Sequence, residues 1–195
     1  MNDLFEPADT SATPLTPEES RGLIPAHIAF RNELNAAEQE NIARAQEWAL
    51  GRPRDILTEK FIQELHRRML GDVWSWAGKF RTSERNLGIA FYEIPVALRE
   101  LLDDARAWIE YSTYSLDEIA VRFHHRLVQI HPFPNGNGRH SRLMTDLLVM
   151  KLGGQRFSWG SANLQPAGDL RRQYINALRA ADQHDYRPLL AFARS

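Results

Sequence analysis

The stretch from His131 to Arg142, HPFPNGNGRHSR, gathers side chains and glycines that could do chemistry together. Gly136 and Gly138 allow backbone conformations that are closed to other residues, so successive N–H groups can converge on an anion. A helix predicted to begin at about Asn137 would direct its positive N-terminal end to the same point. The stretch therefore predicts a phosphate-binding turn.

Charged and polar side chains flank this turn. Arg139 and Arg142 are three residues apart, so on a helix they emerge on neighbouring parts of one face and can hold different phosphates of one nucleotide. Asn137 adds an amide to the same cup. His131 ends the preceding predicted helix, where it could take a proton from an attacking hydroxyl near neutral pH. A base, a cradle and a cationic clamp together predict group transfer from a phosphoanhydride.

Composition limits the other kinds of chemistry. The 195 residues include no cysteine, which excludes thiolate nucleophiles, disulfides and cysteine zinc sites. The net charge of −1 argues against a polyelectrolyte binder, so no direct nucleic-acid binding is expected. No apolar run approaches the roughly 20 residues that span a bilayer, and the N-terminus lacks a secretory pattern. We expect a cytoplasmic protein without membrane contact.

The near-neutral total hides a local asymmetry. Residues 119–145 contain four arginines and no acidic residue, whereas residues 1–20 contain five acidic residues and no lysine or arginine. The acid-free span includes the predicted phosphate-binding turn. We therefore expect a concentrated anion pocket on a balanced surface.

Helices must position these residues. Apolar side chains recur at helical spacing, and capping residues or prolines mark the helix starts. The region between residues 71 and 94 loses this period and carries aromatic residues around a polar turn at 83–86, which predicts a loop and a short hairpin. Residues 1–22 are rich in proline, serine and threonine, which predicts a flexible segment. Helices are expected over about 35–50, 57–70, 95–108, 116–129, 137–152 and 170–181, and from Pro188 onward.

The stretch matches seven positions of the pattern His-x-Phe-x-x-Gly-Asn-Gly-Arg-x-x-Arg, which a random chain of this length would do with a probability of about one in ten million. It resembles the signature of the Fic (Fic/Doc) family of protein adenylyltransferases. The resemblance implies a mainly α fold, a helical bundle with a small β-hairpin flap, in a single domain over residues 23–195. It also implies transfer of AMP from ATP to a tyrosine, threonine or serine hydroxyl of a target protein, with release of pyrophosphate.

The resemblance also implies residue roles. His131 would be the general base, and Phe133 would point into the core and orient the loop. The Gly-Asn-Gly turn would hold the α- and β-phosphates, and the two arginines would bind the outer phosphates. The flap would align the target segment by strand addition. The turn and clamp residues are Gly136, Asn137, Gly138, Arg139 and Arg142, and the flap residues are Asn86, Leu87, Gly88 and Ile89.

The chain departs from the family pattern at the metal position. Most adenylylating members have an acidic residue there that helps to hold Mg²⁺, whereas this chain has Asn135. A neutral amide is a weaker ligand for a hard cation than a carboxylate, so binding of Mg²⁺, or of Mn²⁺, is expected to be weakened.

Many family members also carry an inhibitory helix with the pattern Ser/Thr-x-x-x-Glu-Gly/Asn. Glu40, followed by Asn41, fits the end of this pattern on the helix 35–50, but Ala36 breaks its start. The hypothesis is that Glu40, or its neighbour Glu38, restrains Arg142. The alternative is a solvated helix face.

Other interpretations stay open. The fold could transfer another phosphate-containing group, or the chain could be a non-catalytic nucleotide-binding module that regulates a partner. The chain also resembles the Fic proteins labelled mobile mystery protein B, which implies a small helix-turn-helix partner in a toxin–antitoxin-like pair. Metal capture by His124, His125 and His131 is disfavoured, because adjacent histidines on a helix diverge by about 100 degrees and no cysteine or nearby carboxylate completes a ligand set.

Overall fold

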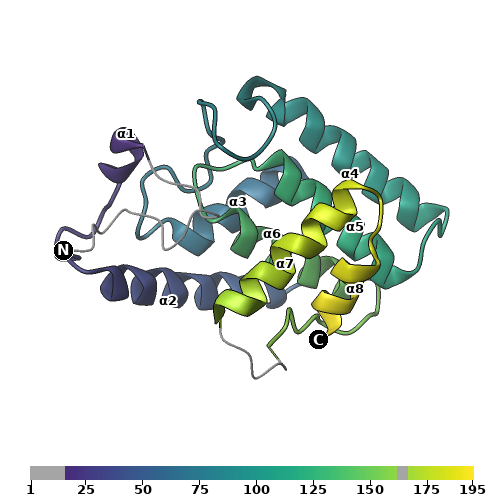
Figure 1. Cartoon of the computed structure of the whole chain (residues 1–195). Helices are drawn as coiled ribbons and strands as arrows, with labels where there is room; N and C mark the ends of the chain where they lie inside the picture. The colour runs from purple at the N-terminus through teal and green to yellow at the C-terminus, as the bar shows by residue number, and fades with distance from the viewer. Residues whose placement is uncertain (1–15, 162–166) are drawn as a thin grey trace.

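Helices α5 and α6 form the centre of the structure, and the other helices pack around them (Figure 1). The computed structural model describes residues 16–161 and 167–195. Helix α4 lies along α5, α2 pairs with α3, and α7 and α8 pack together at the C-terminal end. The elements are α1 Pro17–Ser20, α2 Arg31–Leu50, α3 Glu59–Leu70, the 3₁₀ turn η1 Phe91–Glu93, α4 Ile94–Glu110, α5 Leu116–Ile130, α6 Asn137–Lys151, α7 Ala167–Asp182 and α8 Arg187–Arg194.

Side-chain caps explain where several helices begin. The hydroxyl of Thr58 accepts the N–H of Phe61 at 3.1 Å at the start of α3, and the hydroxyl of Ser115 accepts the N–H of Glu118 at 3.3 Å at the start of α5. Helix α2 begins four residues before the predicted start at Asn35, because the carboxylate of Glu33 accepts the N–H of Phe30 at 3.0 Å. Asn35 therefore lies inside α2 and does not cap its start.

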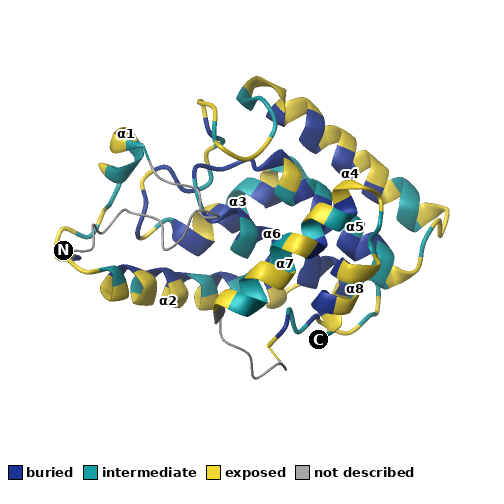
Figure 2. Ribbon diagram, in the orientation of Figure 1, coloured by how far each residue is buried: buried dark blue, intermediate teal, exposed yellow. Residues whose placement is uncertain are grey.

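The apolar faces of the helices meet in one main core and one C-terminal cluster. Figure 2 shows the buried residues on the inward faces of the helices. Phe123, Leu127 and Phe133 are completely buried in the main core, and each such side chain contributes about 1.5–3 kcal/mol of transfer free energy. The second cluster lies where α8 covers α5 and contains Leu189 and Phe192. The predicted mainly helical fold is confirmed.

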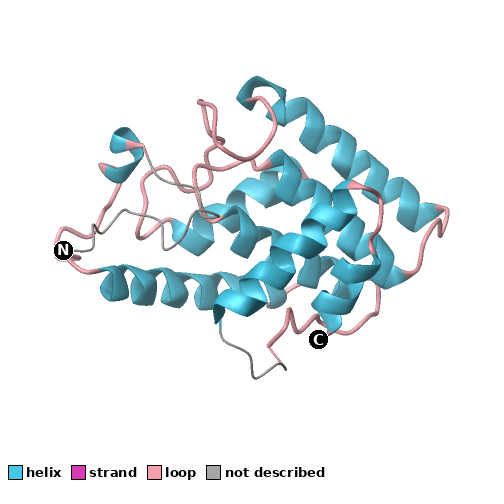
Figure 3. Cartoon of the chain, viewed as in Figure 1, coloured by secondary structure: helices cyan, strands magenta, loops and turns pink. Residues whose placement is uncertain are grey.

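The predicted β-hairpin is not confirmed. Among residues 16–161 and 167–195 there is no strand (Figure 3), only an isolated bridge between Leu23 and Trp74. Residues 81–90 form bends and irregular loop. The Arg81 guanidinium donates to the carbonyl of Ser83 at 3.0 Å and to that of Ile89, so a side chain satisfies carbonyls that a β-ladder would use.

The N-terminal segment expected to be flexible, residues 1–22, falls partly outside the described residues, which begin at residue 16. Residues 16–22 include α1, where Thr16 and Glu19 form a capping box. The indole of Trp76 donates to the carbonyl of Glu19 at 3.1 Å, and the N–H of Ser75 donates to the carbonyl of Gly22 at 2.9 Å. These residues are therefore fastened to the loop after α3.

The sequence predicts that no segment of the chain spans a membrane, and the helices of the described residues bear on this prediction. None of the helices in residues 16–161 and 167–195 has both the length and the apolar character needed to cross a bilayer.

Candidate active site

His131 caps the C-terminal end of α5 in a left-handed backbone conformation with φ +53°. Its side chain is buried. Burial, reinforced by the positive charges of Arg81 and Arg85, lowers its pKa to about 4, although a hydrogen bond to the backbone of Val128 acts in the opposite direction. The imidazole is therefore neutral at pH 7, which is the protonation state that a general base needs.

Arg81 holds the backbone around this histidine and was not predicted as a site residue. Its side chain is fully buried. Its Nε donates to the carbonyl of His131 at 2.7 Å, while its other nitrogens reach the carbonyls of Ser83 and Ile89. One guanidinium thus ties the proposed flap segment to the proposed base. An isolated arginine in a loop gives no sequence signal for this role.

The loop between α5 and α6 is closed by its own side chains. The Oδ1 of Asn137 accepts the N–H of Phe133 at 2.9 Å, and its Nδ2 donates to the carbonyl of Phe133 at 2.8 Å. Phe133 is completely buried, as expected for a residue that orients the loop. The side chain of Asn137 therefore shapes the loop, and its contact with a phosphate stays a prediction.

His66 on α3 supports the same loop, and it was also not predicted. Its Nδ1 accepts the N–H of Gly78 at 2.9 Å, so its Nε2 carries the proton and donates to the carbonyl of Asn135 at 3.0 Å. Its ring stacks on Phe133 with centroids 3.7 Å apart. Burial, and then the neighbouring His140, hold the pKa of His66 well below its ordinary value. The buried, neutral imidazole of His66 therefore supports the loop between α5 and α6.

The two motif glycines differ in how the surrounding structure constrains them. Gly136 has φ +78°, and a Cβ there would lie 2.7 Å from the Cδ1 of Leu70. A Cβ on Gly138, at the start of α6, would meet no atom within 4 Å outside its chain neighbours and its own helix backbone. The space beside Gly138, at the first turn of α6, is therefore free of other side chains, and an anion near a helix N-terminus needs such room.

The two motif arginines have different partners. The Nη1 of Arg139 lies 2.5 Å from the Oε2 of Glu38, whereas the guanidinium of Arg142 lies 5.7 Å from the ring centroid of Tyr174 on α7. Arg142 makes no ion pair among the described residues. Arg139 is thus restrained by a carboxylate, and Arg142 rests against an aromatic ring.

Glu38, and not Glu40, is the acidic residue of α2 that reaches the motif. Glu38 is 7% exposed, and its Oε1 accepts the indole N–H of Trp74 at 2.7 Å. Glu40 is exposed, because the inward face of α2 contains positions 38, 41, 45 and 49. The structure therefore places the neighbour named in the sequence hypothesis at the motif, and on Arg139 instead of Arg142.

Asn135, the residue at the metal position, makes a hydrogen bond within the loop between α5 and α6. The Oδ1 of Asn135 accepts the N–H of Gly136 at 2.6 Å. Within residues 16–161 and 167–195, no group of three or more His, Cys, Asp or Glu residues could hold a metal ion. The side chains present do not fit a metal bound by the protein alone.

The adjacent histidines of α5 have structural partners. His124 contacts the hydroxyls of Thr145 at 3.2 Å and Tyr174 at 2.9 Å, and the Nε2 of His125 lies 2.8 Å from the carboxylate of Asp182. Their partners lie on α6 and α7, so these histidines link α5 to those two helices.

Comparison with known proteins identifies the domain. A model described as Fic/DOC family matches residues 56–149, which include α3 to α6 and the motif. The chain belongs to the Fic/DOC family. The protein adenylyltransferase Fic of Aedes aegypti is 34% identical over 142 residues, which are 71% of this chain and 27% of that protein. This Fic-family chain thus spans about a quarter of the length of the curated relatives that it matches.

Solved Fic structures share the fold. Fic-1 from Caenorhabditis elegans has a TM-score of 0.63 at 24% identity, covering 89% of this chain and 51% of that one. The BepC effector protein from Bartonella tribocorum, solved with bound AMPPNP, has a TM-score of 0.67 at 16% identity, covering 92% of this chain and 97% of that one. At these identities the likeness establishes the Fic fold of this chain.

Proposed function

We propose that this Fic-family chain transfers AMP from ATP to a tyrosine, threonine or serine hydroxyl of a target protein. The observation that carries the proposal is the neutral, buried His131, at the loop that leads into the N-terminus of α6 and its two motif arginines. The adenylyltransferase names of relatives with 32–36% identity support the same reaction.

The reaction would follow from these groups. The neutral imidazole of His131 takes the proton of the target hydroxyl, whose oxygen attacks the α-phosphorus of ATP. A new phosphorus–oxygen bond forms while the bond from the α-phosphorus to the bridging oxygen breaks, and pyrophosphate leaves with the electron pair. The backbone N–H group of Gly138 and the positive end of α6 would stabilise the charge on the phosphates, because the N–H of Gly136 already donates to the Oδ1 of Asn135. Arg139 and Arg142 would hold the outer phosphates.

We infer that Glu38 restrains this reaction. Its carboxylate occupies Arg139, so the phosphates of ATP must compete with Glu38 for that guanidinium. The side chain of Arg139 is only 28% exposed and that of Glu38 only 10%, so the pair is shielded from water. Helix α2 would therefore act as the inhibitory helix through Glu38.

The flap proposal changes in one respect. Residues 86–89 include Leu87, which is 45% exposed, and this apolar side chain could contact a target segment. The carbonyl of Ile89 is already taken by Arg81. Strand addition would therefore have to use other backbone groups of the segment.

The position for a divalent cation is the part of the Fic motif that this chain matches least well. Asn135 offers one amide oxygen, which already accepts a hydrogen bond, so Mg²⁺ or Mn²⁺ would depend mainly on phosphate oxygens and water. No step above is assigned to a metal. A small helix-turn-helix or antitoxin partner and a cytoplasmic location stay predictions from the sequence.

Labelled ATP tests the proposal directly. The protein and its His131→Ala variant are incubated with α-labelled or γ-labelled ATP and a cell lysate, and the labelled bands are identified by mass spectrometry. Label from α-labelled ATP alone, lost in the variant, is expected. Label from γ-labelled ATP would indicate transfer of phosphate. Nucleotide binding without transfer, even after Asn135→Asp, would favour a non-catalytic regulatory module.

A further inference from the structure

A groove with many cationic side chains lies between α2, α3 and the loop at residues 77–79. It consists of two adjoining cavities of about 490 and 710 Å³, which share Arg67, Ala77 and Lys79. None of the motif residues 131–142 lines either cavity. We call this surface the α3 groove, and it is distinct from the proposed active site.

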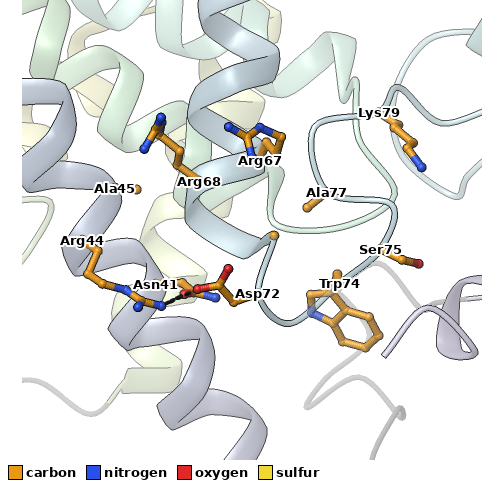
Figure 4. A pocket seen from close by; sticks show the side chains of 11 residues that line it. Asn41, Arg44, Ala45, Arg67, Arg68, Asp72, Trp74, Ser75, Ala77 and Lys79 are labelled. Carbon is orange, nitrogen blue, oxygen red and sulfur yellow. Dashed lines mark hydrogen bonds and ion pairs between the residues drawn. The ribbon is translucent and has the colours of Figure 1, made fainter. Parts of the chain in front are cut away.

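Cations outnumber acids in the α3 groove. Figure 4 shows Arg44, Arg67, Arg68 and Lys79 around the first cavity. The second cavity adds Arg52, Arg54 and Lys60. Only three acidic residues line the two cavities, Asp55, Glu64 and Asp72.

The acidic residues of the α3 groove leave positive charge uncompensated. The carboxylate of Glu64 is shared by Arg67 at 2.7 Å and Arg68 at 2.6 Å. In the described parts of the chain, no carboxylate pairs with Arg52, Lys60 or Lys79, and all three are exposed. The α3 groove therefore contains cations without a carboxylate partner beside two arginines that share one carboxylate. This excess of positive charge favours an anionic ligand.

The crowding of like charges is visible at Arg54. Its pKa is lowered first by desolvation and then by the positive charges of Arg52 and Arg68. An anion placed between these side chains would relieve their repulsion.

The aromatic rings that line the α3 groove indicate which kind of anion it can bind. The guanidinium carbons of Arg54 and Arg68 lie 3.8 and 4.1 Å from the ring centroid of Trp48, and Phe61 stacks on that ring at 5.7 Å. Trp74 is 2% exposed and stacks on Trp76. Protein sites for single-stranded nucleic acid use open aromatic faces, and none of these rings offers one.

We propose that the α3 groove binds an acidic segment of a partner protein, whose carboxylates pair with Arg52, Lys60, Arg67 and Lys79. Forked guanidinium groups suit carboxylates, and each cavity has the volume of a pocket for a ligand much larger than an inorganic anion. The binding does not depend on the proposed AMP transfer. It can be measured without ATP, so failure of one proposal leaves the other intact.

Fluorescence anisotropy with the full chain tests the groove. The probes are a labelled peptide of alternating glutamate and glycine, the same peptide with glutamine for glutamate, and a single-stranded oligonucleotide of equal charge. We expect the acidic peptide to bind, the glutamine peptide not to bind, and affinity to fall as salt is raised. No binding of the acidic peptide, or equal binding of the glutamine peptide, would overturn the proposal.

Paired variants locate the binding. Arg67→Gln combined with Lys79→Gln should weaken binding of the acidic peptide at least fivefold. The control combines Arg99→Gln on α4 with Arg179→Gln on α7, which removes two exposed cations elsewhere and should leave the affinity unchanged. Equal weakening in both pairs contradicts a local site. Tighter binding of the oligonucleotide, lost in the groove variant alone, would assign the groove to nucleic acid and overturn the acidic protein segment.

A single variant keeps the test valid if the double variant is unstable. Lys79 is exposed and has no ion pair in the described residues, so Lys79→Gln is not expected to change the melting temperature. It should still weaken the acidic peptide about twofold or more. An unchanged affinity in this variant would count against the α3 groove.

Discussion

The Oε2 of Glu38 lies 2.5 Å from the Nη1 of Arg139, so helix α2 holds the first arginine of the proposed phosphate-binding motif. The other carboxylate oxygen accepts the indole N–H of Trp74. A nucleotide that needs Arg139 must displace a carboxylate that is itself fixed at both oxygens. The proposed activity is therefore coupled to the position of α2.

Replacing Glu38 should raise activity. Glu38→Gln removes the charge that competes with ATP but keeps an oxygen for Trp74, so the fold should be retained. We expect labelling from α-labelled ATP to rise about tenfold, which corresponds to about 1.4 kcal/mol of released competition. The control is Glu40→Gln on the exposed face of α2, which should not change labelling. Activation by the Glu40 variant alone would refute the role of Glu38.

The pH dependence should report the low pKa of His131. Because its pKa is about 4, the imidazole is already neutral at pH 5 and loses its basicity only as the pH falls through about 4. We expect kcat/KM to show no acid limb from this group near the ordinary histidine pKa of about 6.5. The rate of AMP transfer is measured between pH 4.5 and 8, with folding followed by circular dichroism. A limb near pH 6.5 in folded protein would contradict this prediction.

Removal of His131 gives a second measurement of the same role. His131→Ala should lower the rate of AMP transfer by about 10²–10⁴-fold, the range for loss of a general base. ATP binding should change little, because the proposed phosphate contacts belong to the turn and to α6. A variant that is folded and as active as the original protein would exclude His131 as the base.

Buried histidines should make the fold sensitive to acid. Burial lowers the pKa of His140 to about 4 and that of His124 to about 3. The unfolded chain, with histidine pKa values near 6.5, binds more protons, so the free energy of unfolding falls as the pH decreases from about 6.5 toward 4. Each pKa unit corresponds to about 1.4 kcal/mol as an upper value.

Urea unfolding at pH 7, 5.5 and 4.5 measures this effect. The midpoint should decrease over this range, and His140→Gln should flatten the decrease while keeping a donor for the carbonyl of Ile62. The matched control is His184→Gln, a change in an exposed histidine near the end of α7. A profile that His184 alters and His140 does not would contradict the assignment.

The sequence predicted the motif and most helices because both leave local signals. Periodic apolar residues and the cap at Ser115 place α5, and the glycine pattern places the turn. The supports of the loop left no such signal, because His66 and Arg81 act through contacts across 50 or more residues. The sequence hypothesis names Glu38 beside Glu40, because the sequence alone does not fix which residues of α2 face inward. The predicted β-hairpin is not confirmed, because the Arg81 guanidinium, and not a neighbouring strand, binds the carbonyls of Ser83 and Ile89.

Arg81 should be sensitive even to a conservative change. Lysine keeps the charge but cannot reach the carbonyls of His131, Ser83 and Ile89 together, so Arg81→Lys leaves buried acceptors without partners. We expect a loss of about 1–3 kcal/mol in the free energy of unfolding, from urea denaturation, and a lower kcat for AMP transfer. The control is Arg99→Lys at an exposed position of α4. An Arg81→Lys variant as stable and active as the parent would show that the clamp is dispensable.

Asn135 sets the expected response to divalent cations. Its amide oxygen accepts the N–H of Gly136 at 2.6 Å, and an aspartate there could keep this bond while its second oxygen binds a cation. Asn135→Asp should therefore lower the Mg²⁺ concentration needed for half-maximal labelling about tenfold, and chelation by EDTA should reduce its labelling more steeply than that of the parent. The measurement is a Mg²⁺ and Mn²⁺ titration of AMP transfer at fixed ATP. Asn135→Ser serves as the control, because it removes the amide without adding charge. If the aspartate variant and the parent respond identically to Mg²⁺, the amide does not limit cation binding, and the departure from the acidic residue found in most adenylylating Fic proteins has no effect on metal use.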